Sequence, residues 1–131
     1  PSMASIDLNH AYKRTTIDLL SEGLNKTVTI LGKVLAFVKH ENSTPLYYLI
    51  CDSSGISHVL SVYGMSSDAI KEKDELVIRE PYCRNVDFSW NRKRYKFKSI
   101  RVDFLEQVTV NGKSLSPRLA AHASILAQHK P

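Results

Sequence analysis

Residues 27–38 form an apolar stretch that constrains the fold more than any other part of the chain. Its apolar side chains occupy both parities, with Val28, Ile30, Val34, Ala36 and Val38 on one and Leu31, Leu35 and Phe37 on the other. An extended strand with this pattern needs cover on both faces. Gly32 lies in the middle and lets the strand bend sharply. The stretch therefore predicts a long, bent strand that serves both sides of a small closed barrel.

Further β-rich runs follow, with turn signals between them. Residues 52–55 (Asp-Ser-Ser-Gly) predict a hairpin turn, and Asn111-Gly112 predicts a tight turn near the end. Pro81 interrupts one alternating run and predicts a bulge or an edge position there. We expect the second and third strands over residues 46–52 and 56–63. A fourth strand begins at residues 75–80 and continues over residues 86–90, the fifth spans residues 95–104, and a short final strand follows at residues 107–110.

Three short helices are also expected. Residues 12–23 place apolar side chains at near-helical spacing after Thr15 and Thr16, and Gly23 stops the pattern. Residues 66–73 begin with capping residues and predict a brief helix. Ser116-Pro117 predicts a C-terminal helix that runs through Leu119, Ile125 and Leu126.

The order of three strands, a short helix and two long strands is that of the OB-fold, a mainly β, five-stranded Greek-key barrel. We expect the short helix between strands three and four, and flanking helices at both ends. An SH3-like barrel is the alternative, but it normally lacks the helix. OB-fold ligands usually lie across strands two and three, framed by the loops after strands one and four. Here those loops are residues 39–45 and 91–94.

Composition limits the chemistry that the chain can hold. A chain of 131 residues with 43% hydrophobic and 24% charged residues is expected to fold as one domain with tails. The net charge of +5 favours acidic partners, namely nucleic acid, acidic protein tracts or an anionic membrane surface, without choosing among them. Cys51 and Cys83 suggest neither a disulfide framework nor a zinc site, so we expect no metal and no cofactor. The longest apolar stretch is broken by Gly32 and Lys33, which excludes a transmembrane helix there.

Residues 91–101 carry six cations and no acid, at the point where two strands meet. Arg92, Arg94, Lys96 and Lys98 share one parity, so a regular strand would project them as a ladder that matches successive phosphates. Lys93 is expected at the loop tip. The ladder is compatible with nucleic-acid binding, with a solvated strand edge and with docking to an acidic protein.

The aromatic residues near this turn are expected to be structural. Tyr95 and Phe97 have the opposite parity to the cations, which predicts core positions. The apolar side then switches near Lys98, as a bulge would produce. Phe88 and Trp90 are expected to pack at the barrel end, although they could stack on bases if exposed.

Three tyrosines fall on the predicted ligand-facing strands. Adjacent side chains alternate, so we expect Tyr48 to pack inward with Ile50 while Tyr47 faces outward with Leu49. Tyr63 ends the next strand. Candidate binding residues that extend the basic surface are Lys33, Lys39 and His40.

Catalysis is not expected. His58 lies near Cys51 and Asp52, but no oriented base and oxyanion site accompany it. His122 and His129 are too far apart on the predicted helix to hold one metal ion. The sequence also lacks a phosphate-binding glycine loop and an HExxH motif.

Three separated motifs occur in an order that resembles the C-terminal OB-fold domain of the tetratricopeptide repeat protein 5 (Strap) family. They are residues 74–81 (Asp-Glu-Leu-Val-Ile-Arg-Glu-Pro), residues 95–102 (Tyr-Lys-Phe-Lys-Ser-Ile-Arg-Val) and residues 110–113 (Val-Asn-Gly-Lys). Residues 31–34 (Leu-Gly-Lys-Val) are similar to that domain's first strand. The resemblance covers residues 25–115, so we expect the OB-fold domain there. Residues 1–24 are then a tail that ends a missing repeat array, and residues 116–131 are a C-terminal helix or tail.

The resemblance implies an adaptor rather than an enzyme. Members of this family are described as transcription cofactors in the stress response and as ribosome-associated factors that trigger decay of tubulin messenger RNA. It implies a cytoplasmic and/or nuclear module, monomeric as a fragment, whose partners are nucleic acid (ribosomal RNA or DNA) or an acidic protein surface, and no membrane. The alternative is a purely protein-binding domain that docks on its own tetratricopeptide repeats or on a transcriptional partner. The tail beyond Ser116 departs from the animal proteins and suggests a distant relative, such as a plant protein.

Overall fold

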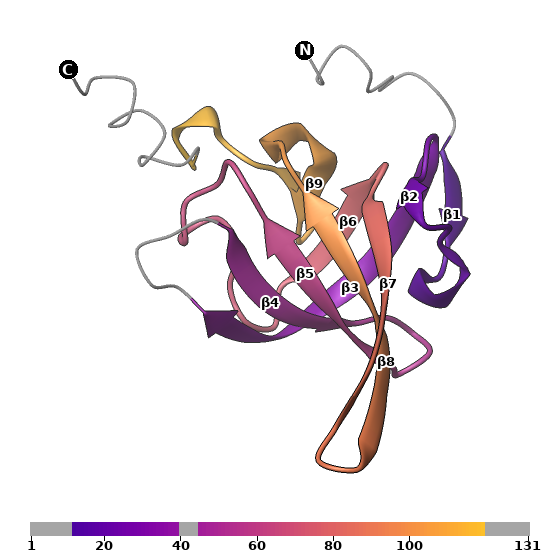
Figure 1. Cartoon of the computed structure of the whole chain (residues 1–131). Helices are drawn as coiled ribbons and strands as arrows, with labels where there is room; N and C mark the ends of the chain where they lie inside the picture. The colour runs from indigo at the N-terminus through magenta and orange to yellow at the C-terminus, as the bar shows by residue number, and fades with distance from the viewer. Residues whose placement is uncertain (1–11, 40–44, 120–131) are drawn as a thin grey trace, which may run out of the picture.

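Strand β3 (Val28–Lys39) is the long strand at the centre of the architecture. It pairs antiparallel with β4 (Leu46–Cys51) along one part of its length and with β6 (Glu75–Arg79) along another. Gly32 lies opposite Leu76, just before β3 passes to β4 at Lys33. The bent strand predicted from residues 27–38 is thus confirmed. The structure is a computed structural model that describes residues 12–39 and 45–119 (Figure 1).

The other pairings complete a Greek-key barrel. Strand β4 pairs with β5 (Ser57–Val62), and β5 runs parallel to β8 (Lys93–Val102), which pairs in turn with β7 (Tyr82–Trp90). Four short strands extend the sheet: β1 (Lys13–Thr15), β2 (Gly23–Leu24), β9 (Val108–Val110) and β10 (Lys113–Ser114).

The sheet has ten strands where five were predicted. Part of the difference is that the predicted fourth strand is divided between β6 and β7. Glu80 has φ 48° and is followed by Pro81, which has no N–H to donate to a ladder. Strand β9 confirms the short strand predicted over residues 107–110, whereas β1, β2 and β10 were not predicted.

The helices expected over residues 12–23 and 66–73 are wrong. The described residues contain only three short 3-10 turns: η2 (Ile17–Leu19), η3 (Leu105–Gln107) and η4 (Pro117–Leu119). Strand β1 pairs with β3 instead of starting a helix, and the Thr16 side chain makes no cap. The backbone N–H of Ile17 donates to Asp52 Oδ2 at 2.7 Å, so a distant carboxylate replaces the cap. Residues 66–74 form turns that place Ala69 and Ile70 in the core. The predicted continuation of the C-terminal helix through Ile125 and Leu126 lies outside the described residues.

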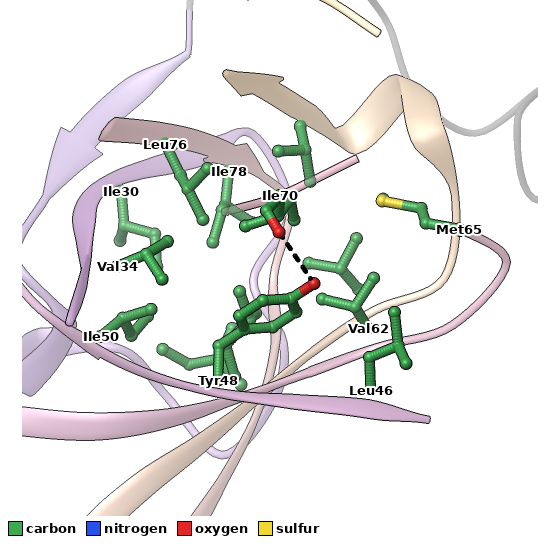
Figure 2. Packing of buried hydrophobic residues seen from close by; sticks show 14 of the residues in the cluster. Ile30, Val34, Leu46, Tyr48, Ile50, Val62, Met65, Ile70, Leu76 and Ile78 are labelled. Atoms are coloured by element: carbon green, nitrogen blue, oxygen red, sulfur yellow. Dashed lines mark hydrogen bonds between the residues drawn. The ribbon is translucent and has the colours of Figure 1, made fainter. Parts of the chain in front are cut away.

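The core is continuous inside the barrel, and Tyr48 is its largest fully buried side chain (Figure 2). The Tyr48 hydroxyl donates to the Ile70 carbonyl oxygen at 3.2 Å, which satisfies a buried polar atom. Burial, with a smaller contribution from the charge of Asp74, raises the pKa of Tyr48 to about 12. The prediction that Tyr48 and Ile50 face inward and Tyr47 faces outward is confirmed.

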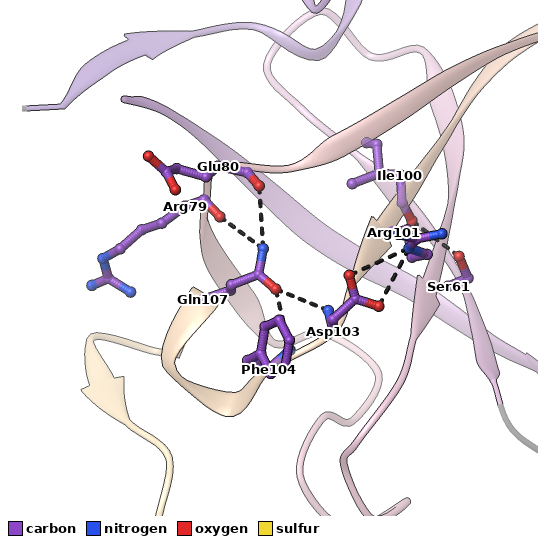
Figure 3. A network of polar contacts seen from close by, with 8 residues as sticks. All are labelled: Ser61, Arg79, Glu80, Ile100, Arg101, Asp103, Phe104 and Gln107. Atoms are coloured by element: carbon purple, nitrogen blue, oxygen red, sulfur yellow. Dashed lines mark hydrogen bonds and ion pairs between the residues drawn. The ribbon is translucent and has the colours of Figure 1, made fainter. Parts of the chain in front are cut away.

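A buried amide fixes the break between β6 and β7 (Figure 3). Gln107 Nε2 donates to the carbonyl oxygens of Arg79 and Glu80 at 3.1 and 3.2 Å. Its Oε1 accepts from the N–H groups of Asp103 and Phe104 at 2.9 and 3.1 Å. One side chain therefore satisfies four backbone groups where the strand ladder is interrupted.

Cys51 and Cys83 are both free. Across the described ranges, no group of three or more potential ligands lies close enough to hold a metal ion. None of the helices within those ranges has the length and apolar character needed to cross a membrane.

Candidate functional site

The β7–β8 hairpin extends beyond the barrel (Figure 1). Strand β5 pairs with β8 only over Ser99–Val102, so the first part of β8 has no strand partner except β7 among the described residues. The β7–β8 register runs without a shift from Tyr82 opposite Arg101 to Trp90 opposite Lys93. The bulge predicted near Lys98 is therefore wrong. The apolar pattern changes there because the ribbon leaves the barrel.

The turn of the hairpin consists of two residues with positive φ, Asn91 (52°) and Arg92 (66°). This is the combination that a type I′ turn requires. The Asn111-Gly112 turn has the same signs, with φ 50° and 81°, and uses glycine at its second position. Arg92 therefore stands where glycine would be less strained, and a non-glycine residue in this conformation costs about 1–2 kcal/mol.

One side of the hairpin is aromatic. The Phe88 ring stacks on Tyr95, with centroids 5.2 Å apart and an interplanar angle of 23°, and meets the edge of Phe97 at 6.3 Å. Phe88 is 46% exposed, and Trp90, on the same side of β7, is 66% exposed. The expectation that Phe88 and Trp90 pack at the barrel end is wrong. Tyr95 and Phe97 are half-buried against this cluster and do not belong to the barrel core.

The opposite side carries Arg94, Lys96 and Lys98, but it is not a uniform ladder of cations. Arg94 forms a two-pronged ion pair with Asp87, at 2.9 Å from Nε to Oδ1 and 2.6 Å from Nη2 to Oδ2. The hydrogen bond from Arg94 lowers the pKa of the Asp87 carboxyl, with the nearby positive charges adding to this effect, so Asp87 is ionised at neutral pH. Arg92 and Lys93 at the tip, and Lys96, are exposed and have no side-chain hydrogen bond or ion pair within the described part of the chain.

Lys98 anchors the base of the hairpin. Its Nζ donates to the Leu20 carbonyl oxygen at 3.1 Å and to Asn85 Oδ1 at 2.8 Å. Its backbone N–H donates to Nδ1 of His58 at 3.1 Å. His58 is 3% exposed, and its Nε2 has no hydrogen-bond partner among the described residues. These contacts make Lys98 a structural residue of the hairpin base.

This arrangement predicts a pH-dependent stability. Burial lowers the pKa of His58 below its usual 6.5, and the Lys98 charge adds to this, while Asp52 and Asp18 oppose it. The folded pKa is thus below the unfolded one, so the neutral side chain stabilises the fold fully above about pH 6.5 and this contribution is lost as the pH falls through the folded pKa. Urea unfolding between about pH 8 and pH 5 should show less of this loss in His58→Gln than in the wild type. An equal loss in both proteins would assign the pH dependence to other groups.

The other predicted site residues do not gather at the hairpin tip. Tyr47 is exposed on the outer face of β4, and Tyr63 is exposed just after the end of β5. The centre of the Tyr63 ring lies 6.0 Å from the Arg101 guanidinium carbon. Lys33 is exposed and lines a separate groove. Lys39 is the last residue of β3, and His40 lies outside the described residues.

Two features of the site were missed from the sequence. Asp87 was not recognised as the partner of Arg94, although counting back from a two-residue turn places them near each other on one side of the ribbon. The Arg101 guanidinium carbon lies 4.6 Å from the centre of the Tyr82 ring in a cation–π contact. Recognising this contact from the sequence also requires the β7–β8 register, which places Arg101 opposite Tyr82.

Three curated relatives share the name tetratricopeptide repeat protein 5. The protein from Bos taurus is 29% identical over 117 residues, which cover 88% of this chain and 27% of the relative. The proteins from Mus musculus and Homo sapiens are 28% and 29% identical over 113 residues, which cover 86% of this chain and 26% of each relative. The chain thus spans about a quarter of the length of the curated relatives that it matches.

A family model described as the tetratricopeptide repeat protein 5 OB fold domain matches residues 11–124. That range includes every strand of the barrel and the whole β7–β8 hairpin. It agrees with the resemblance found in residues 74–81, 95–102 and 110–113. The chain belongs to the family of tetratricopeptide repeat protein 5 OB-fold domains.

Proposed function

We propose that this chain is a non-catalytic binding module that contacts single-stranded nucleic acid, RNA or DNA, through the tip of the β7–β8 hairpin. The observation that carries the proposal is the exposure of Phe88 and Trp90 on the same projecting hairpin as the unpaired cations Arg92 and Lys93. Proteins that bind single strands combine aromatic rings, on which bases stack, with cations that contact phosphates. Both kinds of side chain are present here at the end of one hairpin.

The conformation of Arg92 gives independent support. A hairpin that served only as a solvated edge would gain stability from glycine at this position, as in the Asn111-Gly112 turn. Strained backbone conformations cluster at binding and active sites. The backbone of the turn therefore favours a role for the tip in recognition.

The hairpin geometry changes which cations are expected to bind. Arg92, Lys93 and Lys96 are the candidates, because Arg94 is paired with Asp87 and Lys98 holds the hairpin base. Tyr47 and Tyr63 remain secondary candidates on the outer barrel face, as does Lys33 outside the hairpin.

As part of a tetratricopeptide-repeat adaptor, the module is proposed to act either in a transcription cofactor under stress or on the ribosome during decay of tubulin messenger RNA. The ligand would then be DNA in the first case and ribosomal RNA in the second, with a nuclear or cytoplasmic location respectively. Both contexts come from the family resemblance.

The second candidate function is protein binding, with the barrel docked on its own repeats or on a transcriptional partner. It is favoured by the apolar side chains on the outer side of β3, where Leu31 and Leu35 are 42% and 41% exposed. Exposed apolar patches of this kind often mark protein interfaces.

A salt titration of the turn variant Arg92→Gly tests the proposal. Binding of a short fluorescein-labelled oligouridylate is measured by anisotropy from about 50 mM to about 200 mM salt, a range over which phosphate contacts weaken markedly. The variant should bind more weakly and lower the slope of log affinity against log salt by about 0.7, the value for one phosphate contact on a single strand. It should also be about 1 kcal/mol more stable in urea, since the turn strain is relieved.

Arg94→Ala is the matched control, because it removes a cation that Asp87 already neutralises. It should change the salt slope less than Arg92→Gly does. Absence of oligouridylate and oligothymidylate binding by the wild type at low salt would reject the proposed function and leave protein binding as the better explanation.

A further inference from the structure

A groove of about 770 Å³ lies on the barrel wall, and none of its lining residues comes from the β7–β8 hairpin. It forms at a break in the sheet. Strand β3 pairs with β1 up to Ile30 and with β4 from Lys33 onward. Leu31 and Gly32, between these points, have a strand partner only on the β6 side within the described residues. The groove occupies the position left open beside them.

The groove has apolar side chains that nothing in the described structure covers. Leu19, on η2, is 71% exposed, and Leu31, on β3, is 42% exposed. Leu35, four residues along the same side of β3, is 41% exposed and continues the apolar surface. The volume falls in the range of about 300–1,000 Å³ that is typical of ligand-binding pockets. A large, partly apolar groove of this size marks a binding surface.

Three exposed cations line the same groove: Lys13, Arg14 and Lys33. None of them has a side-chain hydrogen bond or an ion pair in the part of the chain that the structure describes. The groove also contains two acids. Asp52 uses Oδ2 to accept from Ile17 N–H and Oδ1 to accept from Ser54, while Glu75 is the cross-strand neighbour of Lys33 without an ion pair. The cations therefore remain available to an incoming anionic group.

We infer that this groove binds an acidic, leucine-containing peptide segment of a partner protein, with apolar side chains against Leu19 and Leu31 and carboxylates facing Lys13, Arg14 and Lys33. The combination of exposed leucines and unpaired cations is complementary to a segment that alternates acidic and apolar residues. No aromatic residue lines the groove in the described structure, so it lacks the base-stacking surface of the hairpin tip. The groove is separate from the hairpin tip, and peptide binding in it does not depend on nucleic-acid binding at the tip.

The test uses the whole 131-residue chain and a fluorescein-labelled peptide of three Asp-Asp-Leu-Gly-Leu repeats. Two control peptides replace all Asp with Lys, or all Leu with Ser. The acidic, leucine-containing peptide should bind at least about tenfold more tightly than either control, because only it satisfies both the charges and the apolar surface. Equal binding of the basic peptide, or no binding of the acidic one at about 1 mM, would overturn the inference.

Variants then test whether the peptide binds in the groove. Arg14→Glu and Leu31→Ser should each weaken binding roughly threefold to tenfold, since both side chains are exposed and their loss leaves the barrel core intact. Lys113→Glu, an exposed cation outside the groove, is the charge-matched control and should leave the affinity unchanged. Arg92→Gly should leave peptide binding unchanged as well, so failure of the peptide site is distinguishable from failure of the hairpin site. Unchanged affinity in both groove variants would contradict the inference, even if the peptide binds.

Discussion

Replacing Trp90 with alanine is expected to weaken binding of a labelled oligouridylate by roughly 5- to 150-fold. The reason is that removing one aromatic stacking platform costs about 1–3 kcal/mol per base. Trp90 is 66% exposed at the end of β7, so its loss should leave the barrel core unchanged. Phe88→Ala is expected to act through the same surface, with an additional local effect because Phe88 packs on Tyr95 and Phe97. Anisotropy titrations at one fixed salt concentration provide the comparison.

Leu24→Ala is a suitable control for both aromatic variants. Leu24 is 50% exposed on β2 and lies away from the hairpin tip, opposite Tyr82. It should bind oligouridylate like the wild type. If Trp90→Ala and Leu24→Ala bind equally well, the aromatic side of the hairpin has no role in nucleic-acid recognition.

Gly64→Ala is expected to cause the largest loss of stability among the glycine substitutions, about 3 kcal/mol. Gly64 has φ 72°, and an added Cβ would lie 2.8 Å from the Asp103 carbonyl oxygen. Left-handed backbone in a non-glycine residue costs about 1–2 kcal/mol, and forcing an extra carbon into a packed site costs a further ~1–3 kcal/mol. Urea unfolding followed by circular dichroism measures the difference in the free energy of unfolding.

Gly112→Ala separates the two contributions. Gly112 has φ 81°, but an added Cβ would meet nothing within 4 Å, so only the backbone term of about 1–2 kcal/mol applies. The loss should therefore be clearly smaller than for Gly64→Ala. Equal losses would mean that the chain after β5 shifts to relieve the contact with Asp103.

The strands and turns of this fold could be predicted because their signals are local. The alternation around Tyr48 and Ile50, the apolar pattern of residues 28–38 and the Asn111-Gly112 turn each depend on neighbouring residues. The positions of Tyr95 and Phe97 could not be predicted in the same way. Alternation distinguishes the two sides of a strand but not the point where β5 stops covering β8. The exposed aromatic side of the hairpin depends on that non-local limit.

Residues 12–24 show a tertiary contact that overrides a local preference. Their helical spacing is overcome by the pairing of β1 with β3 and by the bond from Ile17 to Asp52, which pattern reading cannot anticipate. Ile17 and Leu20 belong to the barrel core. The boundary that we placed between residues 24 and 25 stays a prediction, as does the assignment of residues 1–24 to the end of a repeat array.

Trp90 is the only tryptophan in the chain, and it lies near the hairpin tip rather than in the core. Its ring is already largely hydrated in the folded protein, so its ultraviolet emission should change little when the barrel unfolds. A base that stacked on it would quench that emission directly. Trp90 emission would therefore report binding of a base at the hairpin tip while changing little on unfolding.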